Sequence, residues 1–409
     1  MKKINSIDLF AGCGGLMEGF EQEGSFNTLG CVEWEKSPCE NLSNRLRIKW
    51  GYENADELVM RFDVQRSDEL FNGYNDTEYG HHVGLDSLVG NNNVDIIIGG
   101  PPCQAYSLAG RIRDDNGMRD DYRNYLFESY IKVVSRYQPS FFIFENVPGM
   151  LSSKPNGIPI TDIIAESFNE AGYYLHENLR ETQFDMTDYG IPQNRKRLII
   201  LGVNKNKFPR TYKEYIDRFY RKILPKYMTP KQTVEHAISD LPKLFPLKTE
   251  EKKNGEKFSH SFSDLDWENN HIPRFHNKRD MKVFNMLAED IINGNNRYCS
   301  SESLKELYTE ITGRKSNVHK YHVLRWDDAS NTIPAHLYKD GLRHIHPDPD
   351  QARSITVREA ARLQTFPDDY KFIGGIMQQY KMIGNAVPPK FSEILAKSVR
   401  ELFSYERTS

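Results

Sequence analysis

The segment GGPPCQ (99–104) places a cysteine directly after a short apolar run, Val94–Ile98, of the kind that forms buried strands. Two prolines stiffen the chain just before the thiol, whereas a structural cysteine usually lies within a strand or a helix. A thiolate displayed on such a turn can act as a nucleophile. Cys103 is therefore the candidate for covalent chemistry.

A carboxyl group and two guanidinium groups adjoin other apolar runs. Glu145 follows Phe141–Phe144, where burial could keep it partly protonated, so that it can donate to a ring nitrogen. Arg195 and Arg197 precede the run Leu198–Val203, and alternate residues of an extended chain project the same way, so both could face one site. Taken singly, Glu145 could instead cap a helix, and the arginines could form a solvated rim.

The first apolar run, Ile4–Phe10, continues into a glycine-rich segment, AGCGGL (11–16). Glycines let the backbone turn with positive φ and approach a ligand, and they open a helix N-terminus toward it, although packing alone would also explain them. The next run ends at Glu33 and Trp34. The acid can accept hydrogen bonds from a ribose, and the indole can cover an adenine. Because the third glycine of GxGxxG is missing, S-adenosylmethionine is favoured over NAD. Asp63 is a further candidate to bind the adenine amine.

The elements that position these residues follow from the apolar runs, which are short and bounded by Gly, Pro or Asn. Those expected to be buried strands are Ile4–Phe10, Phe26–Glu33, Val94–Ile98, Phe141–Phe144 and Leu198–Val203. Between them, Tyr125–Tyr137 and Asp162–Ala171 have helical spacing. This alternation indicates an α/β domain with a mostly parallel sheet covered by helices on both faces. Ligands then lie at the carboxyl ends of the strands.

The alternation of strands and helices fades after about residue 204. Lys248–His260 and Asn293–Glu302 are expected to be loops or poorly ordered insertions. Helical patterns return at Val357–Thr365 and at Lys390–Phe403. We therefore expect a first domain over residues 1–204, a second domain inserted over 205–350, and a return to the first domain over 351–409.

Composition narrows the class of protein. The 409 residues are 38% hydrophobic, too rich for a disordered chain. No apolar run approaches the roughly 18 residues that span a bilayer, and MKKINSIDLF lacks a signal-peptide core, so we expect a soluble intracellular protein. Five cysteines without a CxxC pair indicate neither a disulfide framework nor a zinc site. Histidines 319, 322, 344 and 346 are interpreted as polar loop residues, so no metal is expected.

The net charge of -3, from 54 Lys+Arg and 57 Asp+Glu, at first argues against a nucleic-acid partner. The charge is unevenly distributed, however. Residues 193–231 hold 12 Lys/Arg against two acids, interleaved with aromatic residues. Such a stretch suits phosphate contact, unless it is a solvated helix face. Because a partner responds to the local field, the total charge does not exclude DNA.

Six motifs together, in this order, resemble the C5-cytosine DNA methyltransferases of bacterial restriction–modification systems. They are DLFAGCGGL (8–16), GGPPCQAYS (99–107), ENV (145–147), QNRKRLIILG (193–202), REAARLQTFPD (358–368) and GNAVPP (384–389). The likeness covers residues 4–204 and 352–400, with a variable segment between them. It implies a Rossmann-like, S-adenosylmethionine-dependent fold with a mostly parallel seven-stranded sheet and a smaller inserted target-recognition domain.

The resemblance also implies the role of each catalytic residue. Cys103 would attack C6 of cytosine and form a covalent adduct, which makes C5 nucleophilic. Glu145 would hydrogen-bond or protonate N3, Arg197 would steady the base, and Arg195 would support the cysteine loop. After methyl transfer to C5, loss of the C5 proton and elimination of Cys103 would release 5-methylcytosine.

The family's cofactor contacts carry over to positions in three parts of the chain. These are Phe10, Gly12, Gly14, Gly15, Leu16, Glu33, Trp34, Asp63, Val64, Pro102, Asn385, Ala386 and Val387. The chain departs from the family between Glu33 and the nucleophile strand, where a polar insertion occupies Asn72–Asn93.

The implied partner is double-stranded DNA, with the target cytosine flipped out of the stack. Residues 104–123 resemble the family's mobile active-site loop, and an Asn-Thr-Ile-Pro segment stands where the family has its supporting Thr-Leu dipeptide. The DNA contacts expected from this are Gln104, Ser107, Arg123, Thr332 and Ile333. We further expect a monomer in the bacterial cytoplasm, associated with the nucleoid and paired in function with a restriction endonuclease, and no membrane or metal partner.

Three alternative functions are each distinguished by one feature of the sequence. A tRNA cytosine-C5 methyltransferase would carry a Cys-Phe-Thr tripeptide in the recognition segment, which is absent here. A non-catalytic DNA-binding relative would be expected to have lost Cys103 or Glu145. A NAD-dependent Rossmann enzyme would have the complete glycine pattern.

Overall fold

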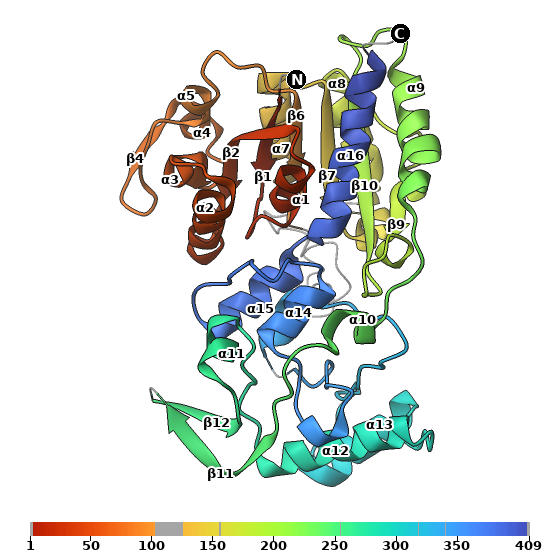
Figure 1. Ribbon diagram of the computed structural model, residues 1–409. Helices are drawn as coiled ribbons and strands as arrows, with labels where there is room; N and C mark the ends of the chain where they lie inside the picture. The colour runs from red at the N-terminus through yellow and green to blue at the C-terminus, as the bar shows by residue number, and fades with distance from the viewer. Residues whose placement is uncertain are drawn as a thin grey trace. The chain divides into compact units, whose positions relative to one another are not determined.

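The computed structural model describes residues 3–102, 126–154, 157–253, 255–317, 319–339 and 341–406. The chain forms two compact units (Figure 1). The first comprises Met1–Tyr189, Arg195–Thr229 and Ala386–Ser409, and the second comprises Gly190–Asn194 and Pro230–Asn385. The domain boundaries expected from the sequence, at 204/205 and 350/351, divide the chain by function and not by compactness. They stay a prediction.

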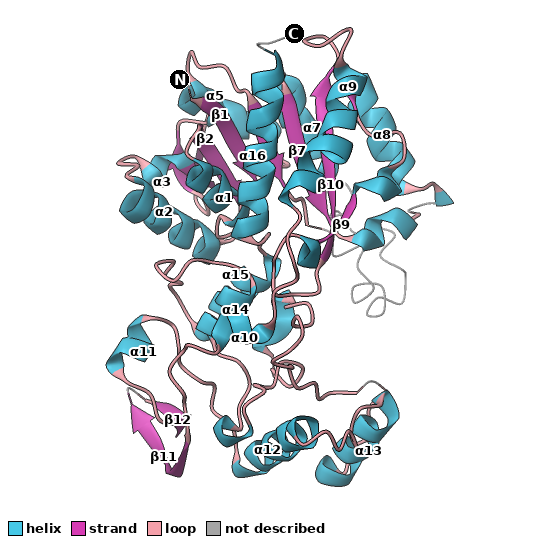
Figure 2. Cartoon of the chain, turned by 45° about the vertical axis from the view of Figure 1, so that its right-hand side comes forward, coloured by secondary structure: helices cyan, strands magenta, loops and turns pink. Residues whose placement is uncertain are grey.

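A twisted sheet forms the centre of the first unit (Figure 2). Its strands are β1 (Ile4–Leu9), β2 (Phe26–Glu33), β3 (Val59–Arg61), β6 (Ile96–Gly99), β7 (Phe141–Asn146), β8 (Tyr173–Tyr174), β9 (Gln183–Asp185) and β10 (Lys196–Asn204). Seven strands follow the order β3-β2-β1-β6-β7-β10-β8, and β9 adds an eighth that pairs with β10. The five strands from β3 to β7 are parallel, and β10 is antiparallel to its neighbours. The expected α/β fold with a mostly parallel sheet is confirmed.

Helices cover both faces of this sheet. Successive side chains of a strand point to opposite faces, so a strand of apolar residues needs cover on both sides. Phe142 stacks on Phe168 of α8 (Ile160–Glu170) and meets Tyr130 of α7 (Leu126–Tyr137) edge-on. Phe141, on the opposite face, packs against Tyr215 of α9 (Tyr212–Asp217) and Phe403 of α16 (Pro389–Glu406). A run of four aromatic and apolar residues is therefore buried on both sides, which explains its lack of polar alternation.

The remaining elements of the first unit are short helices and one small hairpin. They are α1 (Gly15–Glu23), α2 (Lys36–Trp50), α3 (Ala55–Leu58), α4 (Ser67–Asn72), β4 (Tyr74–Asp76), β5 (Gly80–His82) and α5 (Leu85–Val89). α1 packs closely along α16 at Gly19. Any side chain at this position would collide with the backbone at Ser392 and Glu393. The hydroxyl of Ser392 also donates a hydrogen bond to the carbonyl of Leu16.

The second unit is mainly helical. Its elements are α10 (Val234–Ile238), β11 (Pro246–Lys253), β12 (Glu256–His260), α11 (Asp264–Glu268), α12 (Lys278–Ile292), α13 (Ser301–Thr312), α14 (Val357–Leu363) and α15 (Ile376–Asn385). Apolar residues of α12 and α13 form a core with Tyr321, Val323 and Ile345.

The expectation of a loop at Lys248–His260 is wrong, because β11 and β12 pair there as an antiparallel hairpin. The strand residues are almost all polar, so no hydrophobic alternation marks them. The Asn-Gly pair at 254–255 is the usual sequence signal for a two-residue hairpin turn and was the clue to it. The expected loop at Asn293–Glu302 is right up to Ser300, which caps α13.

A buried ion pair organises the motif REAARLQTFPD (358–368) in the second unit. Glu359 accepts two hydrogen bonds from Arg353, each of 2.7 Å, and a third of 2.7 Å from the backbone N–H of Thr356, which caps α14. Both side chains are almost fully buried. Arg353 holds the pKa of Glu359 well below its usual range, against the effect of burial. This part of the motif is therefore structural. Among the described residues, no helix is long and apolar enough to cross a membrane.

Candidate active site

Glu145 lies where β6 and β7 end side by side at the carboxyl edge of the sheet. A Cβ atom placed on Gly100, just after β6, would lie 2.5 Å from Oε2 of Glu145. The carboxylate therefore rests against the backbone of the segment that leads through Pro101 and Pro102 to Cys103. Cys103 itself lies outside the described residues, as do the other expected loop contacts, Gln104, Ser107 and Arg123.

Arg197 reaches the same edge because β10 runs antiparallel to β7, so that β10 begins where β7 ends. Ile199 pairs with Glu145 in the ladder, and Nε of Arg197 lies 2.8 Å from Oε1 of Glu145. Each side chain is only 13% exposed. This is a charge-assisted contact sheltered from solvent, and not the solvated rim or helix cap that the residues taken singly allowed.

Arg195 lies just before β10 and is 1% exposed. Its Nη2 donates a 2.8 Å hydrogen bond to the carbonyl of Ala386. Burial and the neighbouring charge of Arg197 lower the pKa of Arg195, and the charge of Glu145 opposes them. Arg197 thus pairs with the Glu145 carboxylate while Arg195 binds the backbone at Ala386, and the expectation that both arginines face one site stays a prediction.

The glycine-rich segment forms a tight loop between β1 and α1. Phe10, Gly12 and Gly14 have φ values of 57°, 56° and 84°, and the N–H of Gly14 donates to the carbonyl of Ala11 over 2.8 Å. A side chain on Gly15 would collide with the carbonyl oxygen of Val387. The closing motif, GNAVPP, therefore lies directly against the glycine loop.

Glu33 ends β2 beside this loop. Its Oε2 accepts a 2.9 Å hydrogen bond from the N–H of Gly12, and its Oε1 accepts one of 2.8 Å from the N–H of Glu35. Burial raises the pKa of Glu33, and these two hydrogen bonds counteract the rise. The next residue, Trp34, is 51% exposed and donates from Nε1 to the hydroxyl of Tyr79 over 3.0 Å.

The structure therefore gathers most of the expected cofactor residues in the first unit. Asp63 and Val64 belong to this group, because they come directly after β3, whose last residue, Arg61, pairs with Glu33. Oδ1 of Asp63 accepts from the N–H of Gln65 over 3.0 Å. Asn385, by contrast, is the last residue of the second unit, where it is exposed at the end of α15.

The expected DNA-contacting pair in the second unit divides between surface and core. Thr332 is exposed, whereas Ile333 is fully buried. The backbone N–H of Ile333 donates to Oε1 of Gln193 over 3.0 Å, and Nε2 of Gln193 donates to Oε1 of Gln364 over 3.1 Å. Sequence reasoning assigned Gln193 no role, although it lies in the arginine motif. It links the segment with Thr332 to the motif at 358–368.

The aromatic residues of segment 193–231 have a structural cause. Tyr215 and Phe219 are buried, and the hydroxyl of Tyr220 bridges the backbone of β10 at Ile199 and Leu201, with both hydrogen bonds 2.8 Å long. Several of the basic side chains form ion pairs with acids, as Lys226 does with Glu401 over 2.6 Å. Packing thus explains the aromatic residues of this segment, and the phosphate contact expected of its basic residues stays a prediction.

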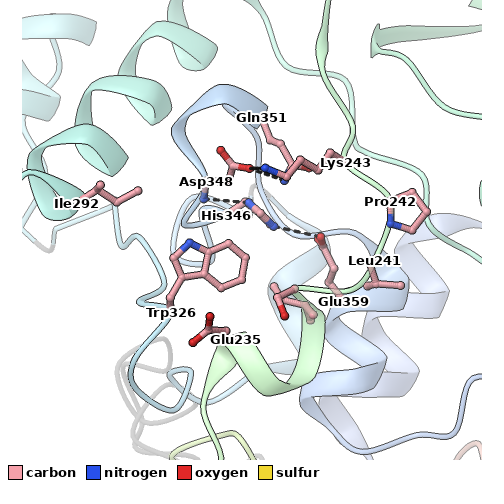
Figure 3. Close-up of a pocket in the computed structure, with 12 residues that line it drawn as sticks. Glu235, Leu241, Pro242, Lys243, Ile292, Trp326, His346, Asp348, Gln351 and Glu359 are labelled. Carbon is pink, nitrogen blue, oxygen red and sulfur yellow. Dashed lines mark hydrogen bonds and ion pairs between the residues drawn. The ribbon is translucent and has the colours of Figure 1, made fainter.

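A cavity of about 350 Å³ in the second unit contains none of the expected site residues (Figure 3). Trp326 and His346 meet edge-on at 5.4 Å, and Nε2 of His346 lies 3.4 Å from Glu359. Lys243 pairs with Asp348 over 3.0 Å. Two of the acids that line the cavity, Asp348 and Glu359, thus have partners within it. In the described part of the chain, no group of three or more His, Cys, Asp and Glu side chains could hold a metal ion.

The family model described as "C-5 cytosine-specific DNA methylase" matches residues 4–401. The chain belongs to this family. This methyltransferase is 34% identical over 451 aligned residues to the type II methyltransferase M.Bpa9945I of Bacillus paralicheniformis, and the alignment covers 97% of this chain and 99% of the relative. It is 29% identical to the type II methyltransferase M1.HphI of Haemophilus parahaemolyticus, over 98% and 88% of the two chains.

Among solved structures, the methyltransferase resembles a candidate DNA modification methyltransferase encoded within an E. coli prophage. The TM-score is 0.61 and the identity 25%, over 98% of this chain and 100% of the other. The family and the activity of a DNA cytosine-5-methyltransferase, both expected from the six motifs, are confirmed. The glycine loop, Glu145 and the arginines therefore lie in a methyltransferase fold that implies the use of S-adenosylmethionine.

Proposed function

We propose that the enzyme methylates C5 of a cytosine within one specific duplex sequence, by flipping that base and attacking it with Cys103. The observation that carries this proposal is the Glu145 carboxylate, paired with Arg197 at 2.8 Å and resting against Gly100. Gly100 stands three residues before Cys103. An acid that lies against the chain segment leading to a cysteine suits attack on a ring whose nitrogen must be protonated or hydrogen-bonded.

The residues around the glycine loop suit S-adenosylmethionine. The left-handed backbone at Gly12 and Gly14 brings main-chain groups within reach of a ligand without Cβ atoms in the way, and Glu33 supplies a carboxylate for a ribose. When bound, the cofactor supplies a methyl group on a cationic sulfur. The residues proposed to hold it are Phe10, Gly12, Gly14, Gly15, Leu16, Glu33, Trp34, Asp63, Val64, Pro102, Asn385, Ala386 and Val387.

In the reaction, the thiolate of Cys103 donates an electron pair to C6, and the electrons of the C5–C6 double bond become available at C5. Glu145, in its protonated form, stabilises the charge that develops by donating a hydrogen bond or its proton to N3, and a donated proton returns to Glu145 when Cys103 leaves. C5 takes the methyl group, while the sulfur that carried it keeps the bonding pair. A base, for which a water molecule suffices, then removes the C5 proton. The electrons of that C–H bond restore the double bond, and Cys103 leaves as thiolate.

The arginines act on this chemistry through position and charge. Arg197 holds the Glu145 carboxylate at the edge of the sheet and steadies the base, and Arg195, which bonds to Ala386, supports the segment bearing Cys103. A buried cation beside the site favours the negative charge that forms on the base.

The DNA side of the proposal places Thr332 against the flipped base, with buried Ile333 fixing its backbone, and gives Gln104, Ser107 and Arg123 DNA contacts. Flipping costs a few kcal/mol of unstacking. We further propose that the enzyme works as a monomer at the bacterial nucleoid and protects host DNA from a partner restriction endonuclease.

Bisulfite sequencing of plasmid and tRNA from cells that express the protein tests the proposal. We expect protected cytosines in one short DNA sequence context, absent with the Cys103→Ser variant. Protection of a tRNA position alone would contradict the proposal, as would unprotected DNA from cells in which the protein is folded and binds its cofactor.

A further inference from the structure

The polar segment Asn72–Asn93, which the sequence resemblance marks as an insertion, contains the β4–β5 hairpin. The hairpin is fastened to the segment after β3 at two points. Tyr74 stacks on Phe62 with ring centroids 3.9 Å apart and planes 11° apart. Asp76 forms a 2.7 Å ion pair with Arg66. The insertion is therefore anchored beside the residues Asp63 and Val64 that are proposed to meet the cofactor.

The turn of this hairpin directs Tyr79 toward Trp34. Oδ1 of Asp76 accepts hydrogen bonds from the backbone N–H groups of Glu78 and Tyr79, of 2.7 and 3.0 Å, which fixes the turn. The ring of Tyr79 meets Phe62 edge-on at 5.2 Å. Its hydroxyl accepts the 3.0 Å hydrogen bond from the indole N–H of Trp34. The position of Tyr79 is thus determined from both sides.

Arg61 completes the arrangement. Its guanidinium lies 5.3 Å from the centre of the Tyr79 ring and donates a 3.1 Å hydrogen bond to the carbonyl of Glu78. Burial raises the pKa of Tyr79, and the charges of Glu78 and Asp63 add to the rise, so the hydroxyl stays neutral and available to the indole. The edge-on contact with Phe62 places Tyr79 beside the residue that precedes Asp63 in the chain.

This arrangement fixes the orientation of the Trp34 indole. A tryptophan that is half exposed leaves a broad apolar face in water, yet its polar edge is tied to Tyr79. A flat face held in one orientation is what stacking on an adenine requires, because stacking gains little from a ring that must first be ordered.

We propose that Tyr79 is a positioning residue of the cofactor site, which holds the Trp34 indole in the orientation that stacks on the adenine of S-adenosylmethionine. The proposal rests on the proposed function, since it needs the cofactor at the glycine loop. It also gives the insertion a role, because the hairpin then sets the affinity for the cofactor and does not take part in methyl transfer.

The proposal is tested by calorimetric titration of the purified full chain with S-adenosylhomocysteine. Tyr79→Phe keeps the ring and removes the acceptor, and it is expected to weaken binding about fivefold, the value of one neutral hydrogen bond. Trp34→Phe removes the donor from the other partner. In the Trp34→Phe background, Tyr79→Phe should change the affinity less than about twofold, because the bond is already gone. Tyr137→Phe, which removes a hydroxyl bonded to Asp86, is the matched control and should bind normally.

Steady-state kinetics add a readout that a loss of folding would not give. For Tyr79→Phe we expect a raised KM for the cofactor, with an unchanged kcat and an unchanged KM for DNA. Wild-type affinity in Tyr79→Phe would overturn the proposal, and so would equal effects of that substitution in the wild-type and Trp34→Phe backgrounds. Tighter binding by Tyr79→Ala would also overturn it, since the hairpin would then obstruct the site. If the wild-type chain does not bind S-adenosylhomocysteine at all, the proposed function fails instead.

Discussion

The substitution Gly100→Ala isolates the contact on which the proposed chemistry depends. The added methyl group would lie 2.5 Å from Oε2 of Glu145, whereas ordinary contact begins near 3.4 Å. The carboxylate must therefore retreat by about 1 Å. The φ of Gly100 is not in the left-handed region, so alanine adds bulk without backbone strain.

Gly100→Ala should lower the rate of methyl transfer and leave the free energy of unfolding almost unchanged. The end of a flexible side chain can move cheaply, so we expect the free energy of unfolding to change by less than about 1 kcal/mol. Moving the carboxylate strains its 2.8 Å contact with Arg197 and misplaces the group that meets N3. A misplacement of about 1 Å costs roughly 100-fold in rate, or about 2.7 kcal/mol of barrier.

Single-turnover transfer of a radiolabelled methyl group to duplex DNA measures this rate. Gly375→Ala is the matched control, because a Cβ there meets no atom within 4 Å. If displacement of Glu145 is the cause, Gly100→Ala should slow the reaction no further in a Glu145→Ala background. A folded Gly100→Ala enzyme that works at the wild-type rate would refute the reasoning, as would an equal loss in both backgrounds.

Three further predictions concern the loop, the buried anchor and the histidines. Gly15→Ala pushes a methyl group into the backbone at Val387 and should cost about 1–3 kcal/mol in urea unfolding together with cofactor affinity; normal values for both would contradict the packing described. Gln193→Ala removes the 3.0 Å hydrogen bond that the buried N–H of Ile333 donates and should lower stability by about 1–3 kcal/mol, with a greater loss of affinity for target DNA than for S-adenosylhomocysteine in binding assays. Among the histidines of the second unit, burial lowers the pKa of His260 to about 4 and that of His276 and His344 to about 3. Below about pH 6.5 the unfolded chain takes up protons that the folded unit does not, so stability present above that pH should fall by about 2 kcal/mol per histidine at about pH 5; a melting temperature that stays constant from about pH 7 to 5 would contradict this.

The sheet and the site around it could be predicted because their signals are local. Buried parallel strands are continuous apolar runs, and the residues after them must gather at one edge, so Glu145, Arg197 and the glycine loop could be placed before the structure was known. The antiparallel direction of β10 is less evident from the sequence, yet it brings Arg197 to Glu145.

What could not be predicted depends on long-range contacts. The β11–β12 hairpin is an exception: its contacts are local, but its strands are polar and have no alternating hydrophobic pattern, so that only the Asn-Gly pair indicates it. Gln193 is important because of partners about 140 and 170 residues away in the sequence, Ile333 and Gln364. Tyr79 likewise has meaning only beside Trp34. The aromatic residues of the stretch at 193–231 also depend on distant partners, since they pack on the sheet, whereas the phosphate contact expected of its basic residues stays a prediction.

Covalent trapping tests the central claim most directly. A duplex that carries 5-fluorocytosine at the cytosine identified by bisulfite sequencing cannot lose a proton from C5, so the adduct should persist after methyl transfer. We predict a stable protein–DNA complex whose peptide map places the attachment at Cys103, and no complex with Cys103→Ser. Attachment at another residue, or methyl transfer to this duplex without any trapped complex, would contradict the mechanism.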